Sequence, residues 1–423
     1  MEPQAGGSNM RQHNVSMAAT RPSDLKLNNR MQILELFKSG SVYSVADIAR
    51  AVGISRQTVM KAIQFFLDKG IIVSDGKADS SSMGGKRAEL FTLSSWRYLI
   101  NVLISPNGLY ISLFNFRCET IDEYLCEAIV SAPVDTIMDA AIEAIDRMLK
   151  KHNINIADVR GVCVTSAGIM ERQGNRLRFN SLFPDWGKDV PIAEKIEAHF
   201  GGDVVICAEN VGKVCGSAYL PDTRAGHLRE VAVFARWGGI TACMMHGGYV
   251  LCGKDSLIGE IGHMILNPDD TEVCGCGSRG CFERQVSTER LRELAAQWAD
   301  EYPGSALAKG KLSELTIRTM FEASAAGDAL GRRLSKYAAT RFASALRNVT
   351  LIFNPERVVF QGDYAFADAH FRKTLFSELQ AFHYYNGTPF DLEMDTRSIQ
   401  TLTTLGAYTL LIDRLFSDET TYS

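Results

Sequence analysis

Hydrophobic residues in the first quarter of the chain recur at the spacing of short amphipathic helices. Residues 27–37 carry apolar side chains at helical spacing, and Ser44 opens a second helix as the first residue of a capping box. Gly53 ends that second helix, and Ser55 caps a longer third helix that stops at Gly70. The pattern therefore predicts three consecutive helices, the last two joined by a glycine turn.

Polar residues on the third helix and basic residues in a later loop predict contact with double-stranded DNA. Strand-like runs at residues 71–74 and 88–93 flank a loop rich in Ser and Gly, which extends the helix-turn-helix to a winged helix. Arginine and glutamine can bond base edges, whereas Ser, Thr and Lys suit phosphates. An alternative is a protein-interaction module or a dimerisation cap. The candidate DNA-binding residues are Ser55, Arg56, Gln57, Thr58 and Lys61 on the helix, with Lys86 and Arg87 in the wing.

Beyond residue 95 the pattern changes to apolar runs of strand length that alternate with amphipathic helices. Such alternation is typical of an α/β architecture. The strand-like runs are 98–105, 109–114, 159–164, 203–207, 231–234 and 358–361. The helical runs are 134–152, 192–199, 288–301 and 331–353. The sequence therefore predicts a flexible tail at 1–22, a winged helix-turn-helix at 23–95 and an α/β body at 96–423.

Length and composition fit a soluble protein of two or three domains. The chain has 423 residues, of which 46% are hydrophobic and 22% charged. No run of eighteen apolar residues appears, and the first twenty residues lack the apolar centre of a signal peptide. We therefore expect a cytoplasmic protein with no membrane partner, whose ten cysteines are reduced thiols or metal ligands.

The two ends of the chain differ in charge. Residues 1–95 carry 12 Lys and Arg against 8 Asp and Glu, whereas the rest of the chain carries 33 against 41. A mildly basic head on an acidic body suits contact with a polyanion through the head alone.

The segment 260–283 concentrates potential metal ligands, namely His263, Cys274, Cys276 and Cys281. One imidazole and three thiolates are the ligand set of a closed tetrahedral zinc site, which leaves no open position for water. Glycines between the cysteines let the backbone turn tightly enough for the sulfur atoms to converge. The alternative, scattered core thiols, suits the other seven cysteines, which mostly lie singly in apolar runs. The spacing therefore predicts a structural Zn²⁺ ion.

This segment, from Glu260-Ile-Gly-His263 to Cys281-Phe-Glu283, resembles the signature of the ROK family of repressors, open reading frames and sugar kinases. The resemblance covers nearly the whole chain after the first twenty or so residues. It implies a body of two lobes of the ribonuclease H-like or actin-like type, with a sugar and nucleotide cleft between them. It also implies that residues 401–416 form the family's closing helix, which packs back on the first lobe.

Three positions that serve phosphoryl transfer in ROK kinases are altered here. The resemblance puts Leu103 where the family has an aspartate that orients metal and nucleotide phosphates, and a leucine cannot hold Mg²⁺. Val211 replaces the aspartate that acts as general base, a group worth roughly a hundred to ten thousandfold in rate. Trp237 and Thr241 replace two glycines of the phosphate turn. The resemblance therefore implies that kinase chemistry is lost.

The positions that hold sugar hydroxyls in the family are retained. Asn210, Glu260, His263 and Glu283 match them, and Asn180 resembles the asparagine of the family's sugar loop. Amides and carboxylates suit a polyhydroxylated ligand, because each hydroxyl both donates and accepts. The alternative is that these residues are remnants of a site without a ligand. A sugar or sugar-phosphate effector is the favoured interpretation.

These features favour a sugar-responsive transcriptional regulator, a repressor of carbohydrate-metabolism genes, that binds operator DNA as a homodimer or homotetramer. One alternative is an active sugar kinase with a displaced base. Another is a repressor whose body binds a protein partner such as a sugar-transport component. Salt-dependent duplex binding, ATP turnover and complex formation indifferent to sugar would distinguish the three.

Overall fold

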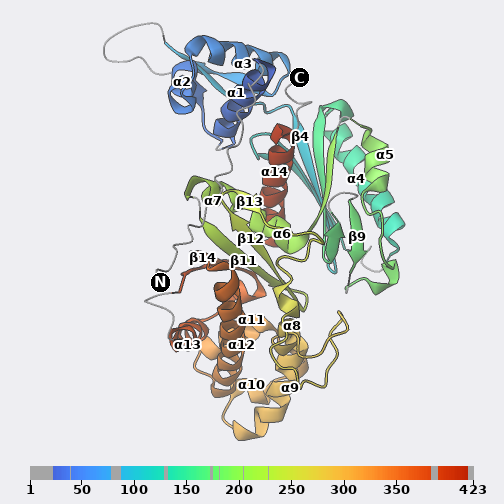
Figure 1. Cartoon of the computed structure of the whole chain (residues 1–423). Helices are drawn as coiled ribbons and strands as arrows, with labels where there is room; N and C mark the ends of the chain where they lie inside the picture. The colour runs from blue at the N-terminus through green and yellow to red at the C-terminus, as the bar shows by residue number, and fades with distance from the viewer. Residues whose placement is uncertain are drawn as a thin grey trace, which may run out of the picture. The chain divides into compact units, whose positions relative to one another are not determined.

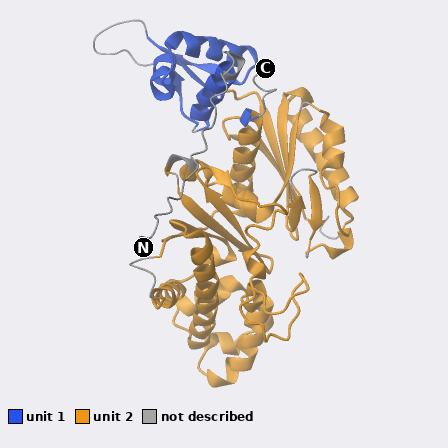
Figure 2. Ribbon diagram, viewed as in Figure 1, with its two compact units in different colours: residues 1–92, 416–423 blue, residues 93–415 orange. Residues whose placement is uncertain are grey.

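The computed structural model describes residues 22–38, 40–77, 87–127, 132–171, 175–180, 182–202, 204–226, 228–382 and 389–417. The chain divides into two compact units (Figures 1 and 2). One contains the residues up to Thr92 together with the end of the chain from Phe416, and the other contains Leu93–Leu415. Within the described ranges no helix is both long and apolar enough to cross a membrane.

The first unit is a winged helix. Its helices are α1 (Pro22–Phe37), α2 (Val45–Val52) and α3 (Arg56–Asp68), and its sheet has the order β1 (Tyr43–Ser44), β3 (Glu89–Leu93), β2 (Ile72–Lys77). The expected capping box is present, since the Ser44 hydroxyl accepts from the Asp47 backbone and the Asp47 carboxylate accepts from the Ser44 backbone. Ile48, Val59 and Phe66 are fully buried between the helices. The three helices predicted from the apolar spacing are therefore confirmed, with α1 starting earlier than expected.

The second unit contains two sheets with the same strand order. In the first sheet the order is β10 (Val205–Asn210), β7 (Val159–Ser166), β4 (Tyr98–Ser105), β5 (Gly108–Asn115), β6 (Thr120–Cys126). In the second it is β15 (Asp391–Asp395), β14 (Arg357–Gly362), β11 (Arg229–Arg236), β12 (Gly239–His246), β13 (Tyr249–Val250). Each sheet starts with an antiparallel meander and adds two parallel strands on the other side of its first strand. This duplication is the two-lobed ribonuclease H-like body that the sequence led us to expect.

Helices cover the faces of both sheets (Figure 1). The first sheet packs against α4 (Val134–Lys151) and α5 (Glu194–Phe200). The second packs against a helical layer made of α8 (Phe282–Gln285), α9 (Thr288–Trp298), α10 (Ala306–Lys309), α11 (Ile317–Ala325), α12 (Ala329–Phe353) and α13 (Ala369–Gln380). The chain also forms α7 (Leu220–Gly226) and a small hairpin of β8 (Ile169–Glu171) and β9 (Arg176–Phe179).

The last helix, α14 (Ile399–Ser417), packs on the first sheet. The Thr404 and Ser112 hydroxyls lie 2.8 Å apart, and the Tyr408 hydroxyl donates to the Phe116 carbonyl at 2.9 Å. Both partners on the sheet belong to β5 or directly follow it. The end of the chain therefore returns to the first lobe.

A short helix, α6 (Val211–Ser217), connects the two sheets. It follows β10 of the first sheet without a break, and its Gly212 lies against β12 of the second. A β-carbon at Gly212 would lie 2.0 Å from Cγ2 of Thr241, so only glycine permits this approach. The carboxyl end of β10 therefore lies beside the β11–β12 turn, where the candidate site is found.

Candidate ligand pocket and metal centre

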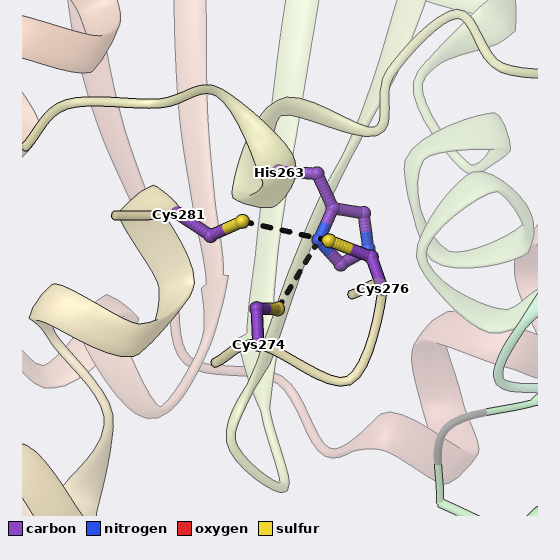
Figure 3. A group of neighbouring side chains, drawn as sticks. All are labelled: His263, Cys274, Cys276 and Cys281. Atoms are coloured by element: carbon purple, nitrogen blue, oxygen red, sulfur yellow. Dashed lines mark hydrogen bonds between the residues drawn. The ribbon is translucent and has the colours of Figure 1, made fainter. Parts of the chain in front are cut away.

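The four predicted metal ligands converge on one point (Figure 3). His263, Cys274, Cys276 and Cys281 each offer a ligand atom, and these atoms all lie within 4.8 Å of one another. The sulfur atoms of Cys276 and Cys281 are 3.6 Å apart, and Cys274 Sγ is 3.7 Å from His263 Nδ1. Zinc–sulfur bonds of about 2.3 Å at a tetrahedral centre place two sulfur atoms roughly 3.8 Å apart. The donor set and its spacing therefore fit a four-coordinate metal ion.

Backbone hydrogen bonds hold the cluster together from two sides. The Cys274 N–H donates to the Ser278 carbonyl at 2.8 Å, and this tight turn carries both Cys274 and Cys276. The Phe282 N–H donates to the Met264 carbonyl at 2.8 Å, which joins the segments of His263 and Cys281. The positions of all four ligands are thus fixed by main-chain contacts that do not involve the ligand atoms.

The surroundings of the three cysteines determine how many of them are thiolates near neutral pH. Burial raises the pKa of Cys281 to about 11 and that of Cys274 well above its usual value. Partial burial acts in the same direction at Cys276, but hydrogen bonds from Ser278 outweigh it and lower the pKa to about 7. Without a cation the cluster holds at most about one thiolate near neutral pH. A bound divalent ion would stabilise the thiolate form of all three cysteines.

A cavity of about 300 Å³ lies beside the metal cluster and collects most of the predicted sugar ligands. Asn210, Glu260, His263 and Glu283 all line it. Asn180 is 1% exposed and does not line the cavity, although its neighbours Phe179 and Leu182 do. The other lining residues are Ala167, Gly168, Ile169, Val211, Phe234, Arg236, Trp237, Gly238, Gly239, Ile240, Thr241, Gly275 and Cys276.

The two asparagines have structural partners. Asn210 caps α6, since its Oδ1 accepts from the Gly212 N–H at 2.8 Å, and its Nδ2 donates to the Gly168 carbonyl at 2.8 Å. Asn180 donates to the Ala167 carbonyl at 3.0 Å and accepts from the Leu182 N–H at 2.9 Å. Asn180 therefore shapes the loop behind the cavity wall, whereas Asn210 forms part of the wall itself.

The carboxylates of the pocket are tied to the metal segment. Glu283 Oε1 lies 3.4 Å from His263 Nδ1 and accepts from Cys274 Sγ at 3.1 Å, and its Oε2 accepts from the Ile240 N–H at 3.3 Å. A β-carbon at Gly262 would come within 2.3 Å of the Ile240 carbonyl, so glycine is needed for this close packing. The metal segment is thereby fastened to β12, which positions Glu283 at the cavity.

Like Trp237, whose Nε1 is buried without a partner among the described residues, Glu260 is an unsatisfied polar group of the pocket. Its Oε1 is buried and has no hydrogen-bond partner among the described residues. Burial raises the pKa of Glu260, an effect that the nearby charges of Lys213 and His263 partly oppose. A buried carboxyl oxygen without a partner is costly, so a ligand hydroxyl that bonds to it would be favourable.

Sequence reasoning missed three charged residues around this cavity, namely Lys213, Arg236 and Asp363. Lys213 is 2% exposed and donates to the Ser256 carbonyl at 2.6 Å. Trp237 and Arg236 line the cavity, and Asp363 lies with Arg236 in a small adjoining cavity. Lys213 follows Asn210 by one helical turn, which could have placed it near the site. The approach of Asp363 to the β11–β12 turn has no local sequence signal.

Apolar side chains occupy the positions that the resemblance linked to phosphoryl transfer. Leu103 is 1% exposed and packs in a cluster with Val211 and Phe234. Val211 and Phe234 also line the cavity, together with Trp237. Neither Leu103 nor Val211 offers an oxygen for a metal ion or a lone pair for a proton.

In the winged helix, the polar residues of α3 are mostly exposed. Ser55 caps the helix, since its hydroxyl accepts from the Thr58 N–H at 3.1 Å, and Thr58 is half-buried. Arg56, Gln57 and Lys61 are exposed, and Arg87 is exposed just before β3. Lys86 lies outside the described residues. The structure thus places three of the predicted side chains on the outer surface of α3.

Comparisons with known proteins give two matching families. The sequence profile of the ROK family matches residues 116–414, and a profile of winged helix-turn-helix DNA-binding domains matches residues 27–73. The putative xylose repressor of Caldicellulosiruptor sp. (strain Rt8B.4) is 26% identical over 80% of this chain and 85% of its own length. The glucokinase of Thermotoga maritima is 27% identical over 54% of this chain and 72% of its own length.

A solved structure shares the fold of nearly the whole chain. The crystal structure of a ROK family transcriptional regulator, a homologue of the E. coli MLC protein, covers 94% of this chain and 100% of its own, with 17% identity and a TM-score of 0.76.

Proposed function

The chain belongs to the ROK family, and we propose that it is a sugar-responsive DNA-binding transcriptional regulator, a repressor of carbohydrate-metabolism genes, without kinase activity. The observation that carries this proposal is the combination of a winged helix with a pocket that keeps Asn210, Glu260, His263 and Glu283 but has Val211 at the base position. The similarity to a putative xylose repressor over most of both chains supports it.

The regulator would bind DNA through α3 and the wing. Arg56, Gln57 and Lys61 are exposed on α3 and suit base edges and phosphates. Ser55 and Thr58 would contact phosphates near the start of α3, and Lys86 and Arg87 would contact the backbone from the wing. A homodimer or homotetramer would present two recognition helices to an inverted repeat.

The metal centre would be structural. His263, Cys274, Cys276 and Cys281 would hold Zn²⁺, which supplies four fixed bonds and no open position for a reactive water. The ion would keep the loop around Cys276 in place beside the pocket, together with Glu283, which follows the ligand Cys281 by two residues.

DNA binding can be tested on the full chain with sites selected from random duplexes. We expect symmetric sites, and an affinity that falls steeply between low and physiological salt. Binding with no sequence preference, or a footprint without symmetry, would argue against the proposal.

Kinase activity needs a separate test, because the chain also resembles a glucokinase. In a coupled assay with ATP and a panel of hexoses and pentoses, we expect no sugar phosphate above background, since Val211 cannot accept the hydroxyl proton. Sugar phosphate that disappears in Glu260→Ala would establish an enzyme instead.

A further inference from the structure

The residues that line the pocket include a polar group and an apolar group, which we call its polar end and its apolar end. At the polar end lie Glu260, His263 and Glu283, of which the last two approach within 3.4 Å. At the apolar end lie Val211, Phe234 and Trp237, which line the cavity and pack together in one apolar cluster. A ligand that fills both ends must itself carry a polar part and an apolar part.

Trp237, at the apolar end, has an unusual backbone conformation. It lies in the turn between β11 and β12 with a φ of 56°, in the left-handed region that Gly, Asn and Asp usually occupy. Its indole lies 6.1 Å from the Phe234 ring, edge to face, and lines the cavity. A bulky aromatic residue in such a turn is unfavourable for the backbone, which points to a role for its side chain.

The carboxylates of the pocket oppose a phosphate group at the polar end. Glu260 and Glu283 are both at the polar end, and the Lys213 ammonium is bonded to the Ser256 carbonyl at 2.6 Å. Arg236 lies over the Trp237 ring at 5.6 Å, and its charge partly offsets the rise in pKa that burial causes at Asp363. A phosphate group beside Glu260 and Glu283 would meet like charges, whereas uncharged hydroxyls can bond to both.

We propose that the effector is an unphosphorylated glycoside with an apolar aglycone, an inference that rests on the proposed function. The sugar hydroxyls bond to Asn210, Glu260 and Glu283, and the aglycone packs against Phe234 and Trp237. Trp237 thereby determines specificity at the apolar end. A volume of about 300 Å³ suits one sugar ring with a compact substituent better than a long oligosaccharide.

The test compares matched ligands on the full-length protein. For each of several hexoses and pentoses, the free sugar, its methyl glycoside, its phenyl glycoside and its phosphate are titrated by calorimetry. We expect the phenyl glycoside of one sugar to bind about tenfold or more tightly than its methyl glycoside, because a phenyl ring buries far more apolar surface than a methyl group. The phosphate of that sugar should bind more weakly than the free sugar.

Two variants test whether Trp237 causes the preference for the phenyl glycoside. Trp237→Asn suits the left-handed turn, so the fold should be kept, and we expect the affinity for the phenyl glycoside to fall to that for the methyl glycoside. Trp298→Ala, on α9 and outside this cavity, is the matched control and should keep the phenyl preference. Thermal melting confirms that both variants are folded.

The outcomes separate the inference from the proposed function. Equal binding of phenyl and methyl glycosides, tighter binding of the phosphate, or an unchanged preference in Trp237→Asn overturns the inference while a sugar effector remains. No binding by any compound of the panel overturns both.

Discussion

Cys276 is the one exposed ligand of the metal cluster, whereas Cys274 and Cys281 are buried. Replacing its sulfur with oxygen therefore removes a ligand without leaving a cavity in the core. We expect the wild-type protein to contain about one zinc ion per chain, and Cys276→Ser to lose most of it and melt at a lower temperature. Metal analysis and thermal melting measure the two effects.

Cys126→Ser is the matched control, because Cys126 is a partly buried thiol outside the cluster. It should keep both the metal and the melting temperature. Wild-type protein that is well folded and free of metal would contradict the assignment.

Glu230 is a fully buried carboxyl on β11 whose proton affinity is altered by folding. Its Oε2 accepts from Arg357 Nε at 2.7 Å, but its Oε1 has no partner in the described part of the chain. Burial raises the pKa of Glu230 to about 7, although Arg357 acts in the opposite direction. The folded state therefore binds this proton more tightly than the unfolded state does. The resulting stability is fully present below a pH of about 4.5 and is lost as the pH rises through 7.

Glu230→Gln should remove this pH dependence. Between about pH 4 and pH 8, we expect the free energy of unfolding of the wild type to fall by about 3 kcal/mol more than that of the variant. Urea unfolding followed by tryptophan fluorescence measures it, since Trp96, Trp186, Trp237 and Trp298 all lie in the α/β body. Glu314→Gln, at an exposed ion pair with Lys311, is the control. Parallel curves for wild type and Glu230→Gln would refute this account.

At the scale of elements, substitutions on α3 should distinguish contacts with bases from contacts that any DNA duplex offers. Arg56 and Gln57 are exposed in its first turn, where the recognition helix of a winged helix meets the major groove. Arg56→Ala and Gln57→Ala should each weaken binding to a selected site by about 1–3 kcal/mol, with a smaller loss on unrelated duplexes. Fluorescence anisotropy on both duplexes measures the difference.

Gln64→Ala provides the matched control, since Gln64 is an exposed glutamine two turns further along α3. It should cost less than Gln57→Ala on the selected site. Equal losses for the two glutamine variants, or equal losses on both duplexes, would mean that α3 is not the recognition helix.

The sequence predicted those elements whose stability is local. The capping box of Ser44 and the glycine turn at Gly53 fix α2 by nearest-neighbour contacts, and the apolar strands β4 and β7 are each buried at all but one residue. In contrast, α6 contains Gly212 and Gly216, each unfavourable in a helix by about 1 kcal/mol relative to alanine. It is helical because it packs between two sheets, which no local pattern reveals. The polar edge strand β15 was missed for a similar reason, since pairing with β14 defines it.

The site shows the same contrast between features set by local sequence and features set by tertiary packing. The metal ligands and Glu260 lie within one short segment, so their spacing alone brought them together. Trp237 and Val211 come from different elements and line the same pocket because α6 lies against β12. Spacing could therefore predict the metal centre, while the apolar end of the pocket required the tertiary structure.

At the scale of the whole molecule, the winged helix and the pocket are joined by a short connection. Strand β3 ends at Leu93 and β4 begins at Tyr98. The Leu93 carbonyl accepts from Arg117 Nε at 2.8 Å, and Arg97 pairs with Asp158 at 2.6 Å, so this connection is fastened to the body. A ligand that changes the body around β4 would act on the DNA-binding unit through this short connection.

We expect the effector and operator DNA to change each other's affinity by one common factor, between about 5-fold and 150-fold, because linkage is reciprocal. Operator titrations with and without ligand, and ligand titrations with and without operator, measure that factor twice. Glu260→Ala should bind operator like the wild type but show no response, since Glu260 lines the pocket and lies outside the DNA-binding unit. Bound ligand with unchanged operator affinity, or a normal response in Glu260→Ala, would show that the pocket does not control the winged helix. Two factors that differ beyond error would mean that the ligand acts through an additional equilibrium, such as assembly of the oligomer.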